Sequence, residues 1–196
     1  ILIGLVGSEM CIRDRYMSDQ FKSQHIHICT HRKDVERINR ALLGESTHTF
    51  TAEIKNDFNI GHAPCDNELK LRVGARVMTL TNNRSQGYFN GSLGVIKEIN
   101  DDKIEVLLDN GCYVIVEKFT WECCDYKLNN GKIEKQIKGT CTQFPLTLAW
   151  AITIHKSQGL QFPNIIIHTK GTFCSGQIYV ALSRCTSLEG LSLIHI

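Results

Sequence analysis

The alternation of apolar and polar positions gives the first outline of the chain. Residues 25–30, HIHICT, alternate polar and apolar side chains and predict a short strand. The next segment, HRKDVERINRALLG, ends at Gly44, a residue that commonly stops helices. Its apolar positions recur at helical spacing: Val35, Ile38, Ala41 and Leu42. This pattern predicts a strand, a turn and a helix, whereas the polar residues 45–68 show no period and are interpreted as a loop.

The middle of the chain has a different pattern. Residues 69–121 contain short runs rich in β-branched and aromatic residues, separated by Asn-Gly pairs at 90–91 and 110–111. The pair Asn110-Gly111 lies between IEVLLD and CYVIVE, which is a strong signal for a β-hairpin. Four or five short strands over this length predict a small barrel of the size of an SH3 domain. A polar hairpin is expected to follow at 122–140.

The last region returns to longer apolar runs. FPLTLAWA, ending at 151, predicts a strand; TIHKSQG predicts a short helix that Thr153 caps; and NIIIHT predicts a buried strand. Ser175 is expected to cap a second helix, whose apolar face combines three residues: Ile178, Leu182 and Cys185. We therefore expect an α/β domain formed by residues 18–68 and 141–191, interrupted by a β-barrel at 69–140.

Both ends of the chain differ from the rest. The N-terminal run ILIGLVG is too short to span a bilayer and lacks the leading positive charge of a signal peptide. Residues 1–17 and the terminal SLIHI resemble translated sequencing-adapter read-through. We therefore expect 1–17 to be a non-native leader and 192–196 a non-native tail, so that the chain is a fragment of a longer protein.

Composition and cysteine spacing argue against two classes of protein, those with a zinc site and those held together by disulfide bonds. The chain has 196 residues, 42% of them hydrophobic, and a formal net charge of +2, so any basic surface has to be local. Its nine cysteines are odd in number and include no CxxC pair, which argues against a zinc site and against a disulfide framework. Reduced thiols in an intracellular compartment fit this pattern, and we expect no metal site.

The densest polar cluster, TIHKSQG, lies between two segments that are predicted to be buried strands. In open α/β sheets, functional residues collect in the loops that leave the carboxyl ends of strands. Thr153 and Ser157 offer hydroxyl groups, Lys156 a cation, and His155 an aromatic face for a base. Gly159 permits a close approach of the backbone. These residue types favour contacts with a phosphodiester backbone.

A second cluster, GQIYVALSRC, places Arg184 at the polar end of an otherwise apolar helix. Taken alone, such an arginine is most often a solvated residue that the helix dipole favours. In phosphoryl transfer the same side chain serves as an arginine finger, which contacts the γ-phosphate. The aromatic pair Tyr88 and Phe89 also leaves two interpretations open, because these side chains either stack on bases or belong to the core.

Together, FPLTLAWAITIHKSQGLQF and GQIYVALSRCTSLEGL resemble motifs V and VI of superfamily 1B DNA helicases of the Pif and RecD type. The block LRVGARVMTLTNN…YFNGSLGVIKEI resembles the SH3-like insertion of their second RecA-like domain, and ICTHRKDVERINRALL is similar to the opening segment of that domain. The resemblance covers roughly residues 25–191. It implies a RecA-like parallel-sheet domain, of the P-loop NTPase type, that carries a small SH3-like β-barrel.

This resemblance also implies an activity: an ATP-driven motor that moves 5′ to 3′ on single-stranded DNA and unwinds duplexes at junctions. Four residues match motif V positions that contact DNA: Thr153, His155, Lys156 and Ser157. Gln158 and Gly159 match the end of that motif nearest the nucleotide, and Arg184 matches the arginine finger. Gln161 falls where related motors contact the nucleotide ribose, a position that varies.

The expected cofactors are ATP and Mg²⁺, yet the sequence lacks a GxxxxGK[ST] phosphate loop. We therefore expect a first RecA-like domain, outside this chain, to bind most of the ATP and Mg²⁺, and the chain alone to be inactive as an ATPase. Two alternatives stay open: a stand-alone single-strand-binding module without motor activity, and a degenerate domain whose barrel docks a protein. The expected location is intracellular, with nucleus, mitochondrion and bacterial cytoplasm undistinguished, and no membrane partner is expected.

Overall fold

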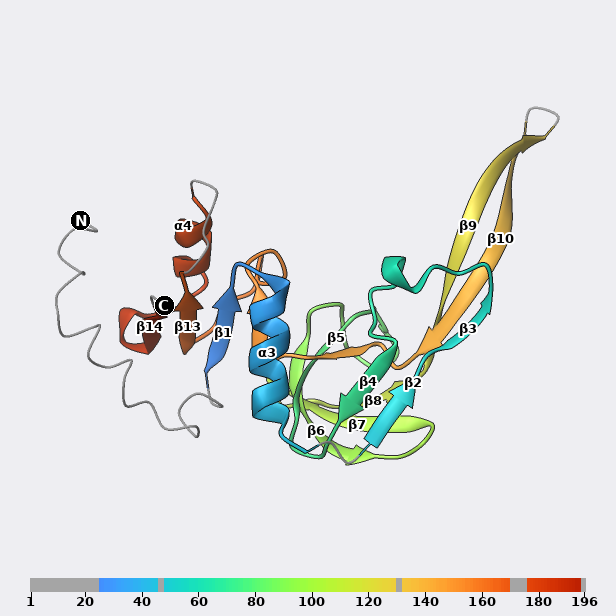
Figure 1. The fold of residues 1–196 in the computed structure, drawn as a ribbon. Helices are drawn as coiled ribbons and strands as arrows, with labels where there is room; N and C mark the ends of the chain where they lie inside the picture. The colour runs from blue at the N-terminus through green and yellow to red at the C-terminus, as the bar shows by residue number, and fades with distance from the viewer. Residues whose placement is uncertain (1–24, 46–47, 130–131, 170–175, 195–196) are drawn as a thin grey trace. The chain divides into compact units, whose positions relative to one another are not determined.

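A computed structural model describes residues 25–45, 48–129, 132–169 and 176–194 (Figure 1). The predicted leader 1–17 and Ser175 lie outside these residues. The described chain divides into two units. One consists of the residues up to Gly44 together with those from Ala149 onward, and the other is Glu45–Leu148. These limits differ from the sequence-based limits at 68/69 and 140/141, and we describe each unit by itself.

A parallel sheet forms the discontinuous unit. Its strands occur in the order β12-β1-β13-β14, and each neighbouring pair is parallel. The strands are β1 (Ile26–Cys29), β12 (Ala151–Thr153), β13 (Ile165–His168) and β14 (Leu191–Ile194). Residues 192–194, which the sequence places in a non-native tail, therefore pair as the edge strand β14. The result is a mixed α/β unit with a parallel sheet, consistent with a RecA-like helicase domain.

β1 is buried along its whole length, although its sequence alternates polar and apolar residues. The alternation suggests a half-exposed strand, but β1 is a central strand whose four residues are all buried, so both of its faces are covered. His27 is accommodated because its Nδ1 lies 2.9 Å from Nε2 of His168 on β13, and the two rings stack. A buried polar side chain is tolerated where it has such a partner.

Helix α3 (Arg32–Leu43) packs against β1 and β12 through Cys29, Ile38 and Ala151. It ends as predicted at Gly44, whose φ of 63° suits glycine and whose N–H donates to the carbonyl of Arg40. The predicted core position Ala41 is exposed, and the adjacent Asn39 is buried instead. The Asn39 side chain donates to the carbonyl of Ala151 and accepts from its N–H, at 3.0 and 2.7 Å, so a polar residue fastens the helix to β12.

The continuous unit is antiparallel and contains three small sheets. Five strands pair in the order β11-β5-β6-β7-β8. They are β5 (Arg76–Thr79), β6 (Leu93–Ile99), β7 (Lys103–Leu108), β8 (Tyr113–Glu117) and β11 (Leu146–Leu148). The predicted Asn-Gly hairpin is confirmed between β7 and β8, where Gly111 has φ 86° and the Asn110 side chain accepts from the N–H of Cys112.

The remaining strands of this unit form a two-stranded and a three-stranded sheet, β2-β4 and β3-β10-β9. Their bounds are β2 (His48–Thr51), β3 (Glu53–Asn56), β4 (Glu68–Leu71), β9 (Phe119–Asn129) and β10 (Lys132–Gln143), with a short 3-10 helix η2 (Ile60–His62) between β3 and β4. The polar hairpin expected at 122–140 is present as β9 and β10 (Figure 1).

Two predictions for the connecting segments are wrong. Residues 45–68 contain strands β2 and β3, because pairing with β4 and β10 compensates for their weak local pattern. The run FPLTLAWA is not one strand. It is divided between β11, which pairs with β5, and β12, which pairs with β1. Buried Ala149 and Trp150 lie between them.

Candidate nucleic-acid and nucleotide interface

TIHKSQG forms consecutive turns after β12 rather than the predicted short helix. The N–H of Ser157 donates to the carbonyls of Thr153 and Ile154 at 3.0 and 3.2 Å. Thr153 therefore caps no helix, but its Oγ1 accepts from the N–H of Lys156 at 3.3 Å and so holds the first turn. Gly159 ends the turn with φ 79°, a conformation that other residues rarely adopt. We call Ile154–Gly159 the β12 turn.

The β12 turn separates its polar side chains into two groups. His155, Lys156 and Gln158 are exposed. Ser157 is fully buried, and its hydroxyl donates to the carbonyl of Ile154 at 2.7 Å. The hydroxyl of Ser157 therefore shapes the turn, whereas His155 and Lys156 are directed toward solvent, where a ligand can reach them.

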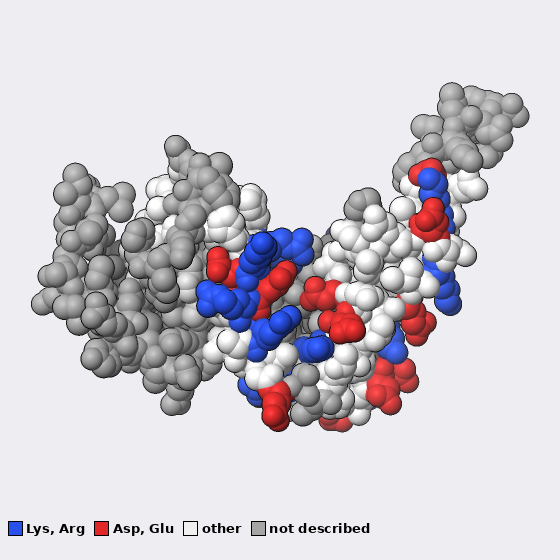
Figure 2. Space-filling view, viewed as in Figure 1, with Lys and Arg blue, Asp and Glu red and all other residues white. Residues whose placement is uncertain are grey.

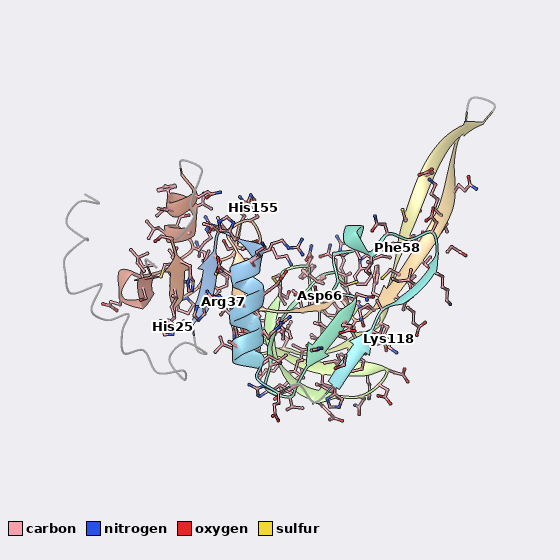
Figure 3. The ribbon with its side chains drawn as sticks, in the orientation of Figure 1. His25, Arg37, Phe58, Asp66, Lys118 and His155 are labelled. Atoms are coloured by element: carbon pink, nitrogen blue, oxygen red, sulfur yellow. The ribbon has the colours of Figure 1, made fainter. Side chains whose placement is uncertain are left out.

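Parallel strands bring the β12 turn beside the loop that follows β1. The N–H of Ile154 donates to the carbonyl of Cys29 at 3.1 Å, so the two strands end at the same edge of the sheet. Thr30 and His31 follow β1 directly and lead into α3, and Figure 3 shows His155 at the end where α3 begins. Sequence reasoning did not assign Thr30 or His31. The parallel pairing is the signal that would have found them, because carboxyl ends of neighbouring strands share one edge.

Arg184 follows helix α4 (Gln177–Leu182), which begins after Gly176. Ile178, predicted to lie on the apolar face of this helix, is 39% exposed, and Ala181, which is not predicted there, is fully buried. The Arg184 guanidinium is partly buried. Its Nε donates to the carbonyl of Val180 at 3.0 Å, Nη2 to the hydroxyl of Ser183 at 2.8 Å, and Nη1 to the carbonyl of Leu160 at 3.4 Å.

A short backbone ladder joins Arg184 to the segment after the β12 turn. The N–H of Phe162 donates to the carbonyl of Arg184 at 2.8 Å, and the N–H of Thr186 donates to the carbonyl of Phe162 at 3.0 Å. Phe162 is 4% exposed and is anchored in the core. With the bond from Arg184 to Leu160, this ladder links the two predicted motifs directly, because Leu160 immediately follows Gly159.

Burial also changes the protonation of groups in the parallel sheet. Desolvation, and to a smaller extent the charge of Arg37, lowers the pKa of His168, while Asp34 opposes this shift. Desolvation together with Asp34 raises the pKa of the Cys29 thiol to about 12, so this cysteine is a neutral core residue. Neither group has the properties of a nucleophile.

The other predicted site residues have less definite surroundings. Gln158 donates its N–H to the carbonyl of His155, and Gln161 is exposed. For the aromatic pair, burial places Tyr88, which is 2% exposed, in the core, whereas Phe89 is 54% exposed and is not a core residue. Within the described ranges, no group of three or more His, Cys, Asp or Glu side chains is arranged to hold a metal ion, and no helix there is long and apolar enough to cross a membrane.

Comparison with known proteins shows which proteins this chain resembles. A profile of the UvrD-like helicase C-terminal domain matches residues 148–188, which include the β12 turn and Arg184. The chain is 30% identical, over 89% of its length, to the ATP-dependent DNA helicase Pif1 of Campylobacter jejuni. It is also 32% identical, over 85% of its length, to human PIF1.

The chain is homologous to the C-terminal part of Pif1-type helicases. Two solved structures support this statement. Bacteroides Pif1 with ADP-AlF3 and single-stranded DNA matches 96% of the chain with 51% identity and a TM-score of 0.85. Bacteroides Pif1 bound to single-stranded DNA matches 86% with 54% identity and a TM-score of 0.78.

The match to Pif1-type helicases covers only part of those proteins. The chain spans 43% of the Campylobacter protein, 26% of the human protein and 44% of the Bacteroides chain in the complex with ADP-AlF3. The roles of individual residues therefore have to be argued from the geometry described above.

Proposed function

We propose that this chain is the second motor domain of an ATP-dependent 5′–3′ DNA helicase, supplying single-strand contacts and the arginine finger. The observation that carries the proposal is the direct connection between the exposed residues of the β12 turn and the partly buried Arg184. The β12 turn exposes His155 and Lys156, and the segment that leaves it accepts a hydrogen bond from Arg184. DNA contact and nucleotide contact thus occur on one continuous piece of structure.

In DNA binding, the residues of the β12 turn and the preceding Thr153 have different roles. Lys156 pairs with a backbone phosphate, and the ring of His155 stacks on a base or contacts the same strand. Thr153 and Ser157 act indirectly, because their hydroxyls hold the turn in shape. Single-stranded DNA is the bound partner in the Bacteroides Pif1 complexes, and this supports the choice of ligand.

The nucleotide half rests on Arg184, with Gln158 and Gly159 at the near end of the β12 turn. Arginine presents several N–H donors in a rigid fork that suits phosphate oxygens. Its guanidinium now donates to Leu160 and Ser183, and the same donors fit the charge that develops on a γ-phosphate. ATP supplies the energy of the reaction. We propose that a P-loop domain elsewhere in the full-length protein holds the nucleotide and Mg²⁺, and that the helicase acts inside the cell.

For the antiparallel unit we propose an SH3-like barrel. The antiparallel ladder of β5, β6, β7 and β8, with β11 returning to β5, supports this assignment. Gly94 also supports it, because a Cβ there would lie 2.6 Å from the carbonyl oxygen of Leu107, so β6 and β7 approach each other closely. Such close approaches are common where strands bend strongly in small barrels.

The test of the proposed function is Arg184→Ala in the full-length protein. Hydrolysis of ATP in the presence of single-stranded DNA should fall by about 10³-fold or more, the range typical of an arginine finger, while ATP binding is retained. Arg184→Lys is the matched control. It keeps the charge but loses the fork, so most of the activity should still be lost. Near-normal turnover in both variants, with unchanged thermal unfolding, would refute the assignment.

The DNA half is tested separately by His155→Ala and Lys156→Gln in the same protein. Both side chains are exposed, so folding should be unaffected. Hydrolysis without DNA should be unchanged, and the stimulation by single-stranded DNA should decrease strongly. Unaltered stimulation in the double variant would exclude the β12 turn as the coupling element.

A further inference from the structure

Helix α3 carries an excess of positive charge that the proposed function does not use. It contains four basic residues against the two acidic residues Asp34 and Glu36, an excess of +2. The entire chain of 196 residues has a formal net charge of +2, so this one helix contributes as much as the whole. The basic residues are Arg32, Lys33, Arg37 and Arg40. Figure 2 shows blue side chains gathered over α3, with red ones among them.

Helical periodicity arranges three of these cations in a line. Lys33, Arg37 and Arg40 occupy positions i, i+4 and i+7 and are all exposed. The opposite side of the helix is apolar and packs on the sheet through Ile38. Nη2 of Arg37 lies 3.3 Å from Oδ1 of Asp34, whereas Lys33 and Arg40 form no ion pair among the residues that the structure describes. We call Lys33, Arg37 and Arg40 the α3 stripe.

The α3 stripe starts at the same edge of the sheet as the β12 turn. β1 and β12 are parallel neighbours, and α3 begins three residues after Cys29, whose carbonyl accepts from Ile154 of the turn. In Figure 3 His155 lies at the beginning of α3, and Arg37 lies farther along the helix. A polyanion that contacts Lys156 at this edge and then follows α3 away from it would therefore contact the α3 stripe next.

We propose that the α3 stripe binds the phosphodiester backbone of a DNA single strand that extends beyond the β12 turn. The inference rests on the proposed function for the identity of the ligand and adds a second contact region to it. With 12 residues, α3 is about 18 Å long, and the stripe from Lys33 to Arg40 covers about 10 Å of that length, enough for contact with a short stretch of the DNA backbone. Contacts of this kind carry no base specificity, so the stripe binds any sequence.

Oligonucleotide length provides the test, using the 196-residue chain itself. Fluorescence anisotropy compares labelled single strands of about 6 and about 20 nucleotides, the shorter reaching the turn alone and the longer covering both regions. For the variant Lys33→Gln/Arg40→Gln, affinity for the longer strand should fall about tenfold near 0.1 M salt, and the slope of log K against log salt should decrease by about 1.4. Affinity for the shorter strand should be unchanged.

Two control variants separate position from total charge. Lys97→Gln/Lys103→Gln removes the same charge from exposed residues of the antiparallel unit and should leave both affinities unchanged. Glu36→Gln removes a negative charge beside the stripe and should tighten binding of the longer strand. All variants replace exposed side chains, so thermal unfolding should match the unaltered chain.

Several results would overturn the inference without affecting the proposed function. An unchanged affinity of Lys33→Gln/Arg40→Gln for the longer strand, an equal loss for both strand lengths, or an equal loss in the control from the antiparallel unit would each do so. The proposed function fails instead through Arg184 and His155 in the full-length protein. The two failures are thus distinguishable.

Discussion

The β12 turn and the loop between β5 and β6 have similar compositions but use their polar residues in opposite ways. In the β5–β6 loop, residues 80–92, Asn83 accepts from the hydroxyl of Ser85 and from the N–H of Gln86, and Asn82 accepts from the N–H of Asn90. These side chains maintain the loop. At the β12 turn, the hydroxyls of Ser157 and of the preceding Thr153 have that task, and His155 is left exposed.

The same contrast extends to the two sheets. Inward positions of β6, β7 and β8 are apolar, as at Ile96, Ile104 and Val116. The parallel sheet buries His27 against His168 and uses Asn39 to hold β12. Polar residues that fasten the fold and polar residues that are proposed to serve a ligand thus differ in their hydrogen-bond partners and exposure. Residue type and density in the sequence do not distinguish them.

The largest effect is expected in the β5–β6 loop, where Tyr88 and Phe89 are adjacent. Tyr88→Ala removes a ring that is 2% exposed and should lower the free energy of unfolding by about 3–5 kcal/mol. Phe89→Ala removes a ring that is 54% exposed and should change it by less than about 0.5 kcal/mol. Urea denaturation of both variants measures the difference. Similar losses for the two would contradict the division between core and surface.

The β12 turn should show the opposite combination of effects. Ser157→Ala removes a buried hydroxyl that donates to Ile154 and should destabilise the chain by about 1 kcal/mol, because the carbonyl still accepts from the N–H of Ser157. His155→Ala should leave the unfolding free energy unchanged. If chemical denaturation ranked the two variants in the reverse order, the assignment of Ser157 to structure and His155 to the ligand would be wrong.

The smallest effect concerns the buried histidine pair. Burial lowers the pKa of His168 from its ordinary 6.5, so the unfolded chain takes up this proton at a higher pH than the folded chain does. Between the two pKa values the unfolded state binds more protons, so stability falls as the pH decreases below about 6.5. The contribution of His168 to the stability stops changing below the pKa of this residue in the folded chain.

Urea midpoints measured across this pH range would show the decline. The variant His168→Gln should flatten it. The charge of Arg37 reinforces the lowered pKa of His168, and Asp34 opposes it. If the dependence of the urea midpoint on pH were unchanged in His168→Gln, the decline would belong to other groups.

Much of the fold follows from local patterns. The helix ending at Gly44, the Asn110-Gly111 hairpin and the buried strand β13 are all confirmed, because periodicity and turn chemistry act within a few residues. β2 and β3 were missed because their stability comes from pairing with distant strands. The division of FPLTLAWA between two sheets was missed for the same reason, since both halves are apolar and only tertiary pairing separates them.

The site shows the same limit. TIHKSQG and Arg184 stand out in the sequence because polar residues interrupt apolar runs. Their connection uses the backbone carbonyl of Leu160, which accepts from the Arg184 side chain, and the backbone groups of Phe162, and backbone groups carry no signature in the residue types. The burial of Ser157 is likewise invisible in the sequence, because serine is mostly an exposed residue and its type does not predict burial.

The discontinuous parallel unit has a consequence for the order of folding during synthesis. Glu45–Leu148 is continuous, and its hairpins join neighbouring segments, so it can fold as soon as it leaves the ribosome. β1 and α3 are synthesised earlier but cannot complete their packing, because Ala151, to which Asn39 is hydrogen-bonded, is synthesised 112 residues later. A unit that folds in between brings these ends closer and lowers the entropic cost of closure. Mutations that slow the folding of the inserted unit should therefore also delay the assembly of the parallel sheet, although they lie outside it.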